Sequence, residues 1–304
     1  MLIKTIKFCL VFVLISFSNI LFAQDDLLSL VDNGEKPKEF VNNAFKSSRV
    51  VNGHSMEFIG KRVLDTRILH RFGLVNSGFS NLYGLDQATM RFGFDYGITN
   101  DFTVGIGRST TGKEWDGFLK YRLIHQSVGG KNPSAVSVVL ITGSTISSSP
   151  WEDPTRKNYF SSRMGFYNEV IFGRKFNENF SAQIAPTHVH VNLVKGKDYT
   201  NDFFAMGLGA RYKLSKRTAF VVDYHYILKP GEGNEGTEND QFTNLKNPLS
   251  LGFDIETGGH VFQLHFSNSS GMNEKAFITN TTKSWGKGEV SFGFNLSRVF
   301  TVSK

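Results

Sequence analysis

Apolar and polar residues alternate along most of the chain, from about residue 62 onward. In QATMRFGFDYGIT (87–99), apolar side chains occupy every second position from Ala88 to Ile98, and the positions between them are polar or glycine. The segments FFAMGLGARYKLS (203–215) and GEVSFGFNLSRVF (288–300) divide in the same way. A period of two is typical of β-strands that have one apolar face and one polar face.

About twelve segments carry this pattern. The strands that they predict cover approximately residues 62–73, 87–98, 102–110, 115–126, 135–146, 161–176, 180–192, 203–214, 218–228, 248–257, 260–268 and 288–300. Most connections alternate between tight turns, such as 177–179, and long loops, such as 229–247. Strands near ten residues long with this loop asymmetry are typical of outer-membrane barrels. The sequence therefore predicts an all-β, integral outer-membrane, antiparallel up-and-down barrel of about 12 strands, with both termini periplasmic.

A soluble β-sandwich or lipocalin-like barrel is the alternative fold, because the cores of these proteins also alternate. In a soluble protein, the face opposite the apolar one would be exposed to solvent and rich in lysine. Here that face carries glycine, serine and arginine together with acidic residues. The 29 Phe, 30 Gly and only 7 Pro of the chain also agree with many strands. The pattern favours the membrane barrel.

The first residues have the features of a secretory signal peptide. Lysines at positions 4 and 7 precede an apolar run, and Ala23 stands before a polar stretch. The predicted domains are the signal peptide (1–23), a periplasmic or plug-like segment (24–61) and the transmembrane β-barrel (62–304). Loss of the two lysines with the signal lowers the formal net charge from +7 to +5 (7 − 2 = 5), so we expect no nucleic acid partner.

Four runs of the sequence resemble an uncharacterised family of β-barrel proteins from the outer membranes of Bacteroidota. These runs are FKSSRVVNGHSME (45–57), GLDQATMRFGFDYGIT (84–99), GLGARYKLSKR (207–217) and GFDIETGGHVFQLHFSNSSGM (252–272). The resemblance implies the barrel fold and the outer-membrane location. It implies no activity, because none is established for that family.

Strand parity predicts which polar side chains line the lumen. Nine basic and eight acidic residues fall on the inward face, and this near-balance predicts pairing across a narrow lumen. The lining candidates are Asp65, Arg67, Arg71, Arg91, Asp95, Lys120, Arg122, Arg163, Glu169, Arg211, Asp223, Asp254, Glu256 and His265. We expect a narrow channel for small polar or charged solutes. The alternative is a structural or partner-binding barrel of an envelope complex without conductance. The expected surroundings are outer-membrane lipid, with solutes or envelope proteins as partners.

A second alternative is lipid hydrolysis. His265 and Ser267, in HFSN, are similar to the His-x-Ser-Asn segment of the outer-membrane phospholipase A family. That resemblance implies that His265 acts as the base and Ser267 as the nucleophile. Two features depart from it: Gly286 stands where the family's segment has asparagine after tryptophan, and the alternation turns both residues inward instead of toward lipid. The residues therefore do not favour an enzyme.

Three histidines are candidates for metal binding, namely His188, His190 and His225. Neutral imidazoles with a neighbouring carboxylate suit zinc or copper. No close spacing brings three ligands together in the sequence, so we expect neither a metal nor a cofactor.

Overall fold

The computed structural model describes residues 36–151, 153–194, 199–229 and 241–302. The predicted signal peptide and the first part of the 24–61 segment lie outside these residues. No helix in the described part is long and apolar enough to cross a membrane. The chain divides into two compact units, and the larger one (Phe40–Val128 and Ser134–Lys304) contains the barrel.

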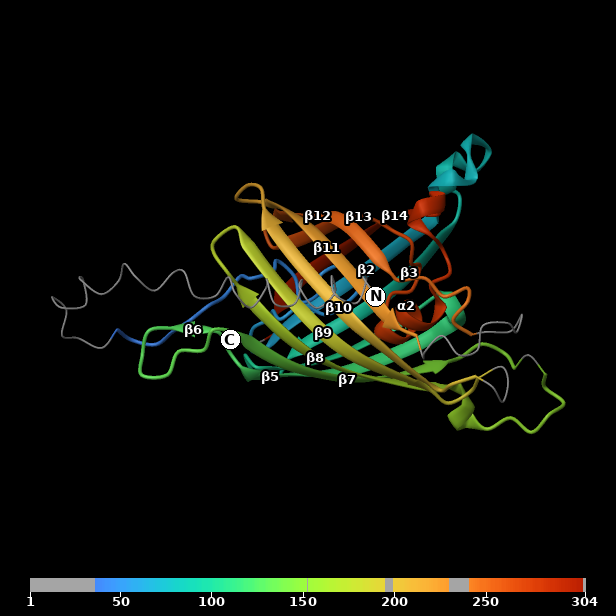
Figure 1. The fold of residues 1–304 in the computed structure, drawn as a ribbon, viewed down its shortest axis with the longest axis horizontal. Helices are drawn as coiled ribbons and strands as arrows, with labels where there is room; N and C mark the ends of the chain where they lie inside the picture. Colours follow the sequence, from blue (N-terminus) through green and yellow to red (C-terminus); the bar gives the residue numbers. More distant parts are fainter. Residues whose placement is uncertain (1–35, 152, 195–198, 230–240, 303–304) are drawn as a thin grey trace, which may run out of the picture. The chain divides into compact units, whose positions relative to one another are not determined.

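Twelve antiparallel strands close into one barrel, in which each strand pairs with the next along the chain and β14 pairs with β2. Figure 1 shows these strands crossing the barrel at a tilt. The strands are β2 (Val63–Leu74), β3 (Ala88–Gly97), β4 (Phe102–Ser109), β5 (Glu114–Ile124), β7 (Ser137–Ser147), β8 (Met164–Lys175), β9 (Phe180–Val191), β10 (Asp202–Lys213), β11 (Thr218–Leu228), β12 (Leu249–Thr257), β13 (His260–Ser267) and β14 (Ser291–Thr301). The predicted antiparallel all-β barrel and its number of strands are confirmed, and the periplasmic location of both termini stays a prediction.

The remaining elements are short. The two-residue strands β1 (Glu39–Phe40) and β6 (Ser127–Val128) form a separate sheet. The helix α2 (Glu274–Asn280) begins after Asn273, whose side chain accepts a hydrogen bond from the Ala276 N–H. Five 3-10 turns complete the described structure, at Val75–Ser77, Phe79–Gly84, Thr111–Lys113, Phe160–Arg163 and Trp285–Lys287.

The two faces of the wall differ as the alternation predicts. In β13, Phe262, Leu264 and Phe266 point outward and are exposed, whereas Gln263 and His265 between them are buried inside. The other strands repeat this division, and the outward face is rich in exposed Phe, Leu and Tyr. An apolar outer surface of this extent suits contact with lipid.

Residues 44–59, which we call the inner segment, lie buried inside the barrel. The segment contains a small hairpin in which the Val50 N–H donates to the Gly53 carbonyl at 2.9 Å and the Ser55 N–H donates to the Ser48 carbonyl at 3.0 Å. Side chains from β2, β5, β9, β11, β13 and β14 all hydrogen-bond to it. Because these strands surround the barrel interior, the inner segment occupies that interior.

The loop between β13 and β14 also folds inward. On α2, Glu274, Phe277 and Ile278 are buried, and the helix packs against β8, β9 and β10. The Phe277 ring lies 4.6 Å from the His225 ring of β11, measured between ring centroids. The interior is therefore filled by two separate parts of the chain, the inner segment and α2.

Candidate functional site: the barrel interior

The tip of the inner segment is held by one carboxylate. The backbone N–H groups of Val51, Asn52 and Gly53 donate to Asp223 Oδ2, at 3.3, 2.7 and 2.9 Å. Hydrogen bonds to an ionised acceptor are stronger than those between neutral groups. Gly53 also permits a close approach, since a Cβ at this position would lie 3.1 Å from Cε1 of His225. The wall thus recognises the backbone of the tip.

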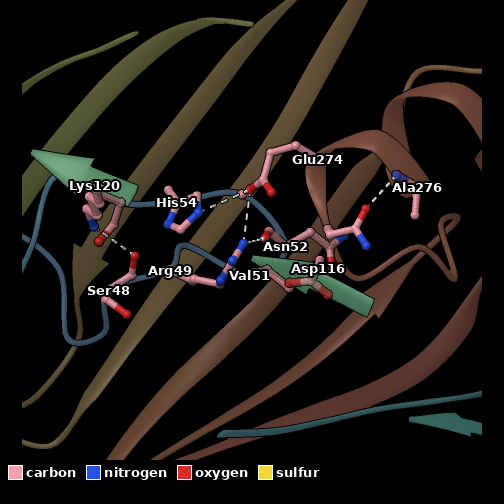
Figure 2. Close-up of polar contacts among 12 residues, drawn as sticks. Ser48, Arg49, Val51, Asn52, His54, Asp116, Lys120, Glu274 and Ala276 are labelled. Carbon is pink, nitrogen blue, oxygen red and sulfur yellow. Dashed lines mark hydrogen bonds and ion pairs between the residues drawn. The ribbon is translucent and has the colours of Figure 1, made fainter. Parts of the chain in front are cut away.

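Lys120 of β5 binds the inner segment from another side. Its Nζ donates to the carbonyl oxygens of Ser55, Glu57 and Ser48, at 2.7, 2.6 and 3.3 Å. Figure 2 shows this lysine beside Ser48. Carbonyl oxygens of the inner segment therefore satisfy the N–H groups of this buried amino group.

Three amide side chains of the wall complete these contacts. Gln183 accepts from the Met56 N–H at 2.9 Å and donates to the His54 carbonyl at 2.6 Å. Gln263 donates to the Val50 carbonyl at 2.7 Å, and Asn295 donates to the Val51 carbonyl at 2.9 Å. An amide group can donate and accept at once, so it suits a polypeptide backbone.

Arg49, His54 and Glu274 connect the inner segment to α2 (Figure 2). Arg49 donates to Glu274 Oε1 at 3.0 Å, and His54 Nε2 lies 3.7 Å from the same oxygen. Burial, followed by the charges of Arg49 and Lys120, lowers the pKa of His54 well below its ordinary value. His54 is therefore neutral in this arrangement, despite the nearby carboxylate.

Several predicted lumen residues bind the inner segment instead of one another. Arg71 donates to Asn52 Oδ1 at 2.7 Å, and Arg211 donates to the Ala44 carbonyl at 3.2 Å. Lys120 and Asp223 act as described above. The prediction that the charged lining pairs mainly with itself is therefore wrong for these four side chains, because the inner segment supplies their partners.

Two ion pairs do form among the lining residues. Arg91 binds Asp116 through two hydrogen bonds, of 2.8 and 2.5 Å, in the bidentate geometry that suits a guanidinium and a carboxylate. Arg67 donates to Asp65 at 3.1 Å and also contacts the inner segment through Ser47 and Ser48.

Three further acidic candidates, Asp95, Glu169 and Asp254, are also buried on the inward face. Asp254 accepts from Gln263 at 2.9 Å. Within the described part of the chain, the carboxylate oxygens of Asp95 and Glu169 accept no hydrogen bond.

Three of the predicted lining residues lie near the ends of strands. Arg122 donates to Asp101 at 3.0 Å, close to the start of β4. Arg163 lies in the 3-10 turn before β8, where it donates to the Ser147 carbonyl at 2.9 Å. Glu256 pairs with Lys46, and its side chain is 43% exposed. These residues border the interior and do not line its centre.

His265 and Ser267 do not form a catalytic pair here. Both are buried and face inward, but Ser267 Oγ accepts from Ser250 Oγ at 2.9 Å. Neither ring nitrogen of His265 has a hydrogen-bond partner among the described residues. Asn268, the next residue of the HFSN motif, holds the loop by accepting from the Leu249 N–H at 2.8 Å. A base in contact with its nucleophile, which hydrolysis requires, is not formed by these side chains.

The three candidate histidines fall on opposite faces of the wall. His188 and His190 face outward, and each lies 2.8 Å from the same oxygen of Asp202. His225 faces inward, with its Nδ1 3.4 Å from Asp223 Oδ1. They cannot share one metal ion, and the described residues contain no group of three or more side chains arranged to hold one.

Two neutral interior residues, Gln183 and Asn295, were not predicted. The same parity that located the charged residues also places them inward. The Asn52-Gly53 dipeptide is a turn signal that would have predicted the hairpin tip. Glu274 had no comparable signal, because it lies in a long loop.

A comparison with protein families agrees with this fold. A family model described as "Membrane bound beta barrel domain (DUF5777)" matches residues 45–300. Among solved structures, the chain is similar to the NanC porin, with 12% identity and a TM-score of 0.49, over 77% of this chain and 98% of that one. It is also similar to the outer membrane protein Omp33 of Acinetobacter baumannii, with 8% identity and a TM-score of 0.39, over 79% and 99% of the two chains. No curated protein matches.

Proposed function

We propose that this chain, which belongs to the family of membrane-bound β-barrel domains DUF5777, is a narrow channel for small polar or charged solutes, plugged by the inner segment. The proposed location is the outer membrane, reached through the predicted signal peptide. Charged and amide side chains cover the inward wall, and such a surface would favour water and polar solutes once the segment has moved.

The observation that carries this proposal is how the inner segment is held. Lys120, Asp223 and Gln183 bind its backbone through side-chain hydrogen bonds, whereas the wall strands pair continuously with one another. Water can replace each of these side-chain bonds, and an intramolecular hydrogen bond contributes only about 0.5–3 kcal/mol net, with the higher values for charged groups. The segment could therefore leave without opening the barrel wall.

Conductance in planar bilayers tests the proposal. The full chain would be compared with a variant in which residues 44–59 are replaced by a Gly-Ser linker of equal length. We expect the full chain to be mostly silent and the variant to conduct steadily. As a control, the same kind of linker would replace the exposed loop residues 153–158, and this change should leave the conductance unchanged. A folded 44–59 variant that stays silent would refute the channel.

A structural or partner-binding barrel without conductance is the second candidate. It is supported by the filling of the interior by two parts of the chain, which meet through Arg49 and Glu274. On this proposal, the inner segment is a permanent core. Its replacement would then lower the thermal stability of the barrel and produce no current.

A further inference from the structure

A groove of about 630 Å³ lies on the outer surface of the barrel. Most of its lining is apolar and comes from outward side chains of neighbouring strands, among them Leu119, Tyr121, Leu140, Val170, Phe204 and Met206. Thr142, Asn168 and His188 also line it. These three side chains lie on the side of the wall opposite the lumen. The groove is therefore independent of the proposed channel.

The polar side chains of the groove form a row across three strands. Thr142 of β7 is in register with Asn168 of β8, which is in register with His188 of β9. Thr142 Oγ1 donates to Asn168 Oδ1 at 2.9 Å. His188 continues the row to Asp202, which His190 also contacts. The row thus extends from the wall to the end of β9 and the start of β10.

This row is costly on a surface that faces lipid, because hydrocarbon satisfies no hydrogen bond. Asn168 Nδ2 carries two N–H donors, and it has no hydrogen-bond partner among the residues that the structure describes. An occupant of the groove with acceptor oxygens would satisfy these donors. The two N–H donors of Asn168 therefore favour a ligand that carries acceptor oxygens.

The groove lies over a proline of the wall. Pro186 of β9 lines it, and the register of β8 with β9 is the same on both sides of this residue, at Glu169/Thr187 and Phe172/Ile184. Proline has no N–H to donate and is normally excluded from the middle of a sheet. Pro186 therefore leaves one position of the sheet without a backbone N–H donor beside the groove.

We infer that this groove binds one glycerophospholipid molecule from the surrounding membrane. Its acyl chains lie against the apolar walls, and an ester carbonyl oxygen accepts from Asn168 Nδ2. The head group lies toward His190 and Asp202. Asn168 is four residues from the start of β8, about 13 Å along the strand, so it can reach groups below the head group.

The surroundings of the groove support this occupant over a second copy of the chain. The outward face of a membrane-bound barrel is in contact with lipid, and a slender acyl chain fits a concavity. A second barrel would present a convex wall to the same surface. In addition, ester carbonyls are acceptors without donors, which matches the two N–H groups of Asn168.

Lipid binding to the purified, delipidated full chain tests the inference. Native mass spectrometry would count bound phosphatidylethanolamine, supplied either as the diester or as the diether that lacks both carbonyl oxygens. We expect one diester lipid per barrel and roughly fivefold weaker binding of the diether, as for the loss of one hydrogen bond. The near-isosteric variant Thr142→Val/Asn168→Leu should bind the diester as weakly as the diether.

A matched control is Thr66→Val, which changes an outward threonine of β2 that does not line the groove. It should retain the diester lipid. Equal binding of the two lipids by the unchanged protein would overturn the inference. So would a dimer that disappears in the double variant, since a second copy would then occupy the groove. If the double variant does not fold, the diester–diether comparison on the unchanged protein still decides.

Discussion

Asp223 forms the most concentrated contact between the wall and the inner segment, because one of its oxygens accepts three backbone N–H groups. Asp223→Asn removes the charge and nearly keeps the size of the side chain. We expect the tip to loosen by about 1–3 kcal/mol, the usual cost of weakening bonds to a buried charged acceptor. Hydrogen exchange at Val51, Asn52 and Gly53 measures this directly and should accelerate by about tenfold or more.

The control for this variant is Asp116→Asn. Asp116 is equally buried but binds Arg91 of the wall and makes no hydrogen bond to the inner segment in the described structure. Asp116→Asn should destabilise the barrel as a whole. The amides of Val51, Asn52 and Gly53 should keep their protection from exchange relative to the amides of the wall strands. If both variants expose the tip to the same extent, the three bonds to Asp223 do not hold it specifically.

His54 makes retention of the inner segment depend on pH. The ring faces the cations Arg49, Lys120, Arg67 and Arg91 and one carboxylate, Glu274, and it packs edge-on against an aromatic ring of β5. Burial and these cations lower its pKa in the plugged state, so the released state binds more protons. Stability of the plugged state therefore rises with pH, and it falls by up to about 1.4 kcal/mol per unit below the ordinary pKa near 6.5.

The measurement is the exchange rate of the inner-segment amides, corrected for intrinsic chemistry, between pH 7.5 and 5. His54→Gln removes this titration and should flatten the dependence. Glu57 contributes separately to the pH dependence. Burial raises its pKa, so ionisation of Glu57 at higher pH opposes retention of the inner segment. An identical pH profile with and without the histidine would show that His54 is not the sensor.

The sequence identified most of the inward charged residues but not their partners. Parity places Asp223 and Lys120 on the inward face, since alternation is a local property. Their partners, such as Asn52, lie far away along the chain and are backbone groups, which no side-chain pattern marks. Charge balance then suggested pairing within the lining, which the structure shows only in part.

At the scale of elements, inward glycines of the strands make room for the inner segment. A Cβ at Gly173 of β8 would lie 2.3 Å from Met56 Sδ. Gly173→Val should therefore displace this part of the segment, because overpacking typically costs about 1–3 kcal/mol. Trypsin cleavage after Arg49, which is buried in the plugged state, should become about tenfold faster.

Gly117→Val is the comparison within the same barrel. A Cβ at Gly117 meets only the Gly105 carbonyl, at 3.5 Å, which is an ordinary contact. Cleavage after Arg49 should then keep its original rate. An equally fast cleavage in both variants would mean that valine weakens the barrel in general.

The strands could be predicted more accurately than the helix. Each strand has its own alternation of apolar and polar residues, which predicts its position locally. The largest errors in the predicted strand boundaries are at the starts of β8 and β14, where 3-10 turns precede the strands. In contrast, α2 has only seven residues, too few for a helical period to stand out. Its burial depends on contacts with three strands that no local pattern indicates.

For the whole molecule, closure of the barrel could be predicted, whereas the sequence left the inner segment open between a periplasmic position and a plug of the lumen. An apolar outer face with unpaired edges is unstable in lipid, so twelve such strands must close. The sequence 44–59 has no comparable constraint, because its mixture of polar and apolar residues suits either water or a polar lumen. The contacts of Lys120 and Asp223 place it inside.

A reversible cross-link can distinguish a movable plug from a permanent core. A Cβ at Gly209 of β10 would lie 2.9 Å from Val50 Cγ2, close to the separation of about 3 Å between Cβ and the far sulfur of a disulfide. Val50→Cys/Gly209→Cys should therefore tie the inner segment to the wall under oxidising conditions. In planar bilayers at pH 5, where protonation of His54 favours release, we expect the oxidised variant to be silent. The same variant should conduct after reduction beforehand with dithiothreitol at alkaline pH, where the reactive thiolate forms.

The single variant Gly209→Cys shows what the wall substitution does by itself, including any displacement of Gln183, whose Cγ lies 2.9 Å from the added Cβ. Its conductance should not respond to dithiothreitol. If the double variant is cross-linked yet conducts as well as its reduced form, ions pass without movement of the segment. If both forms are silent while the 44–59 replacement conducts, the lumen can carry current but the segment stays in place under these conditions. Only current that follows the redox state of the cross-link identifies the inner segment as the gate.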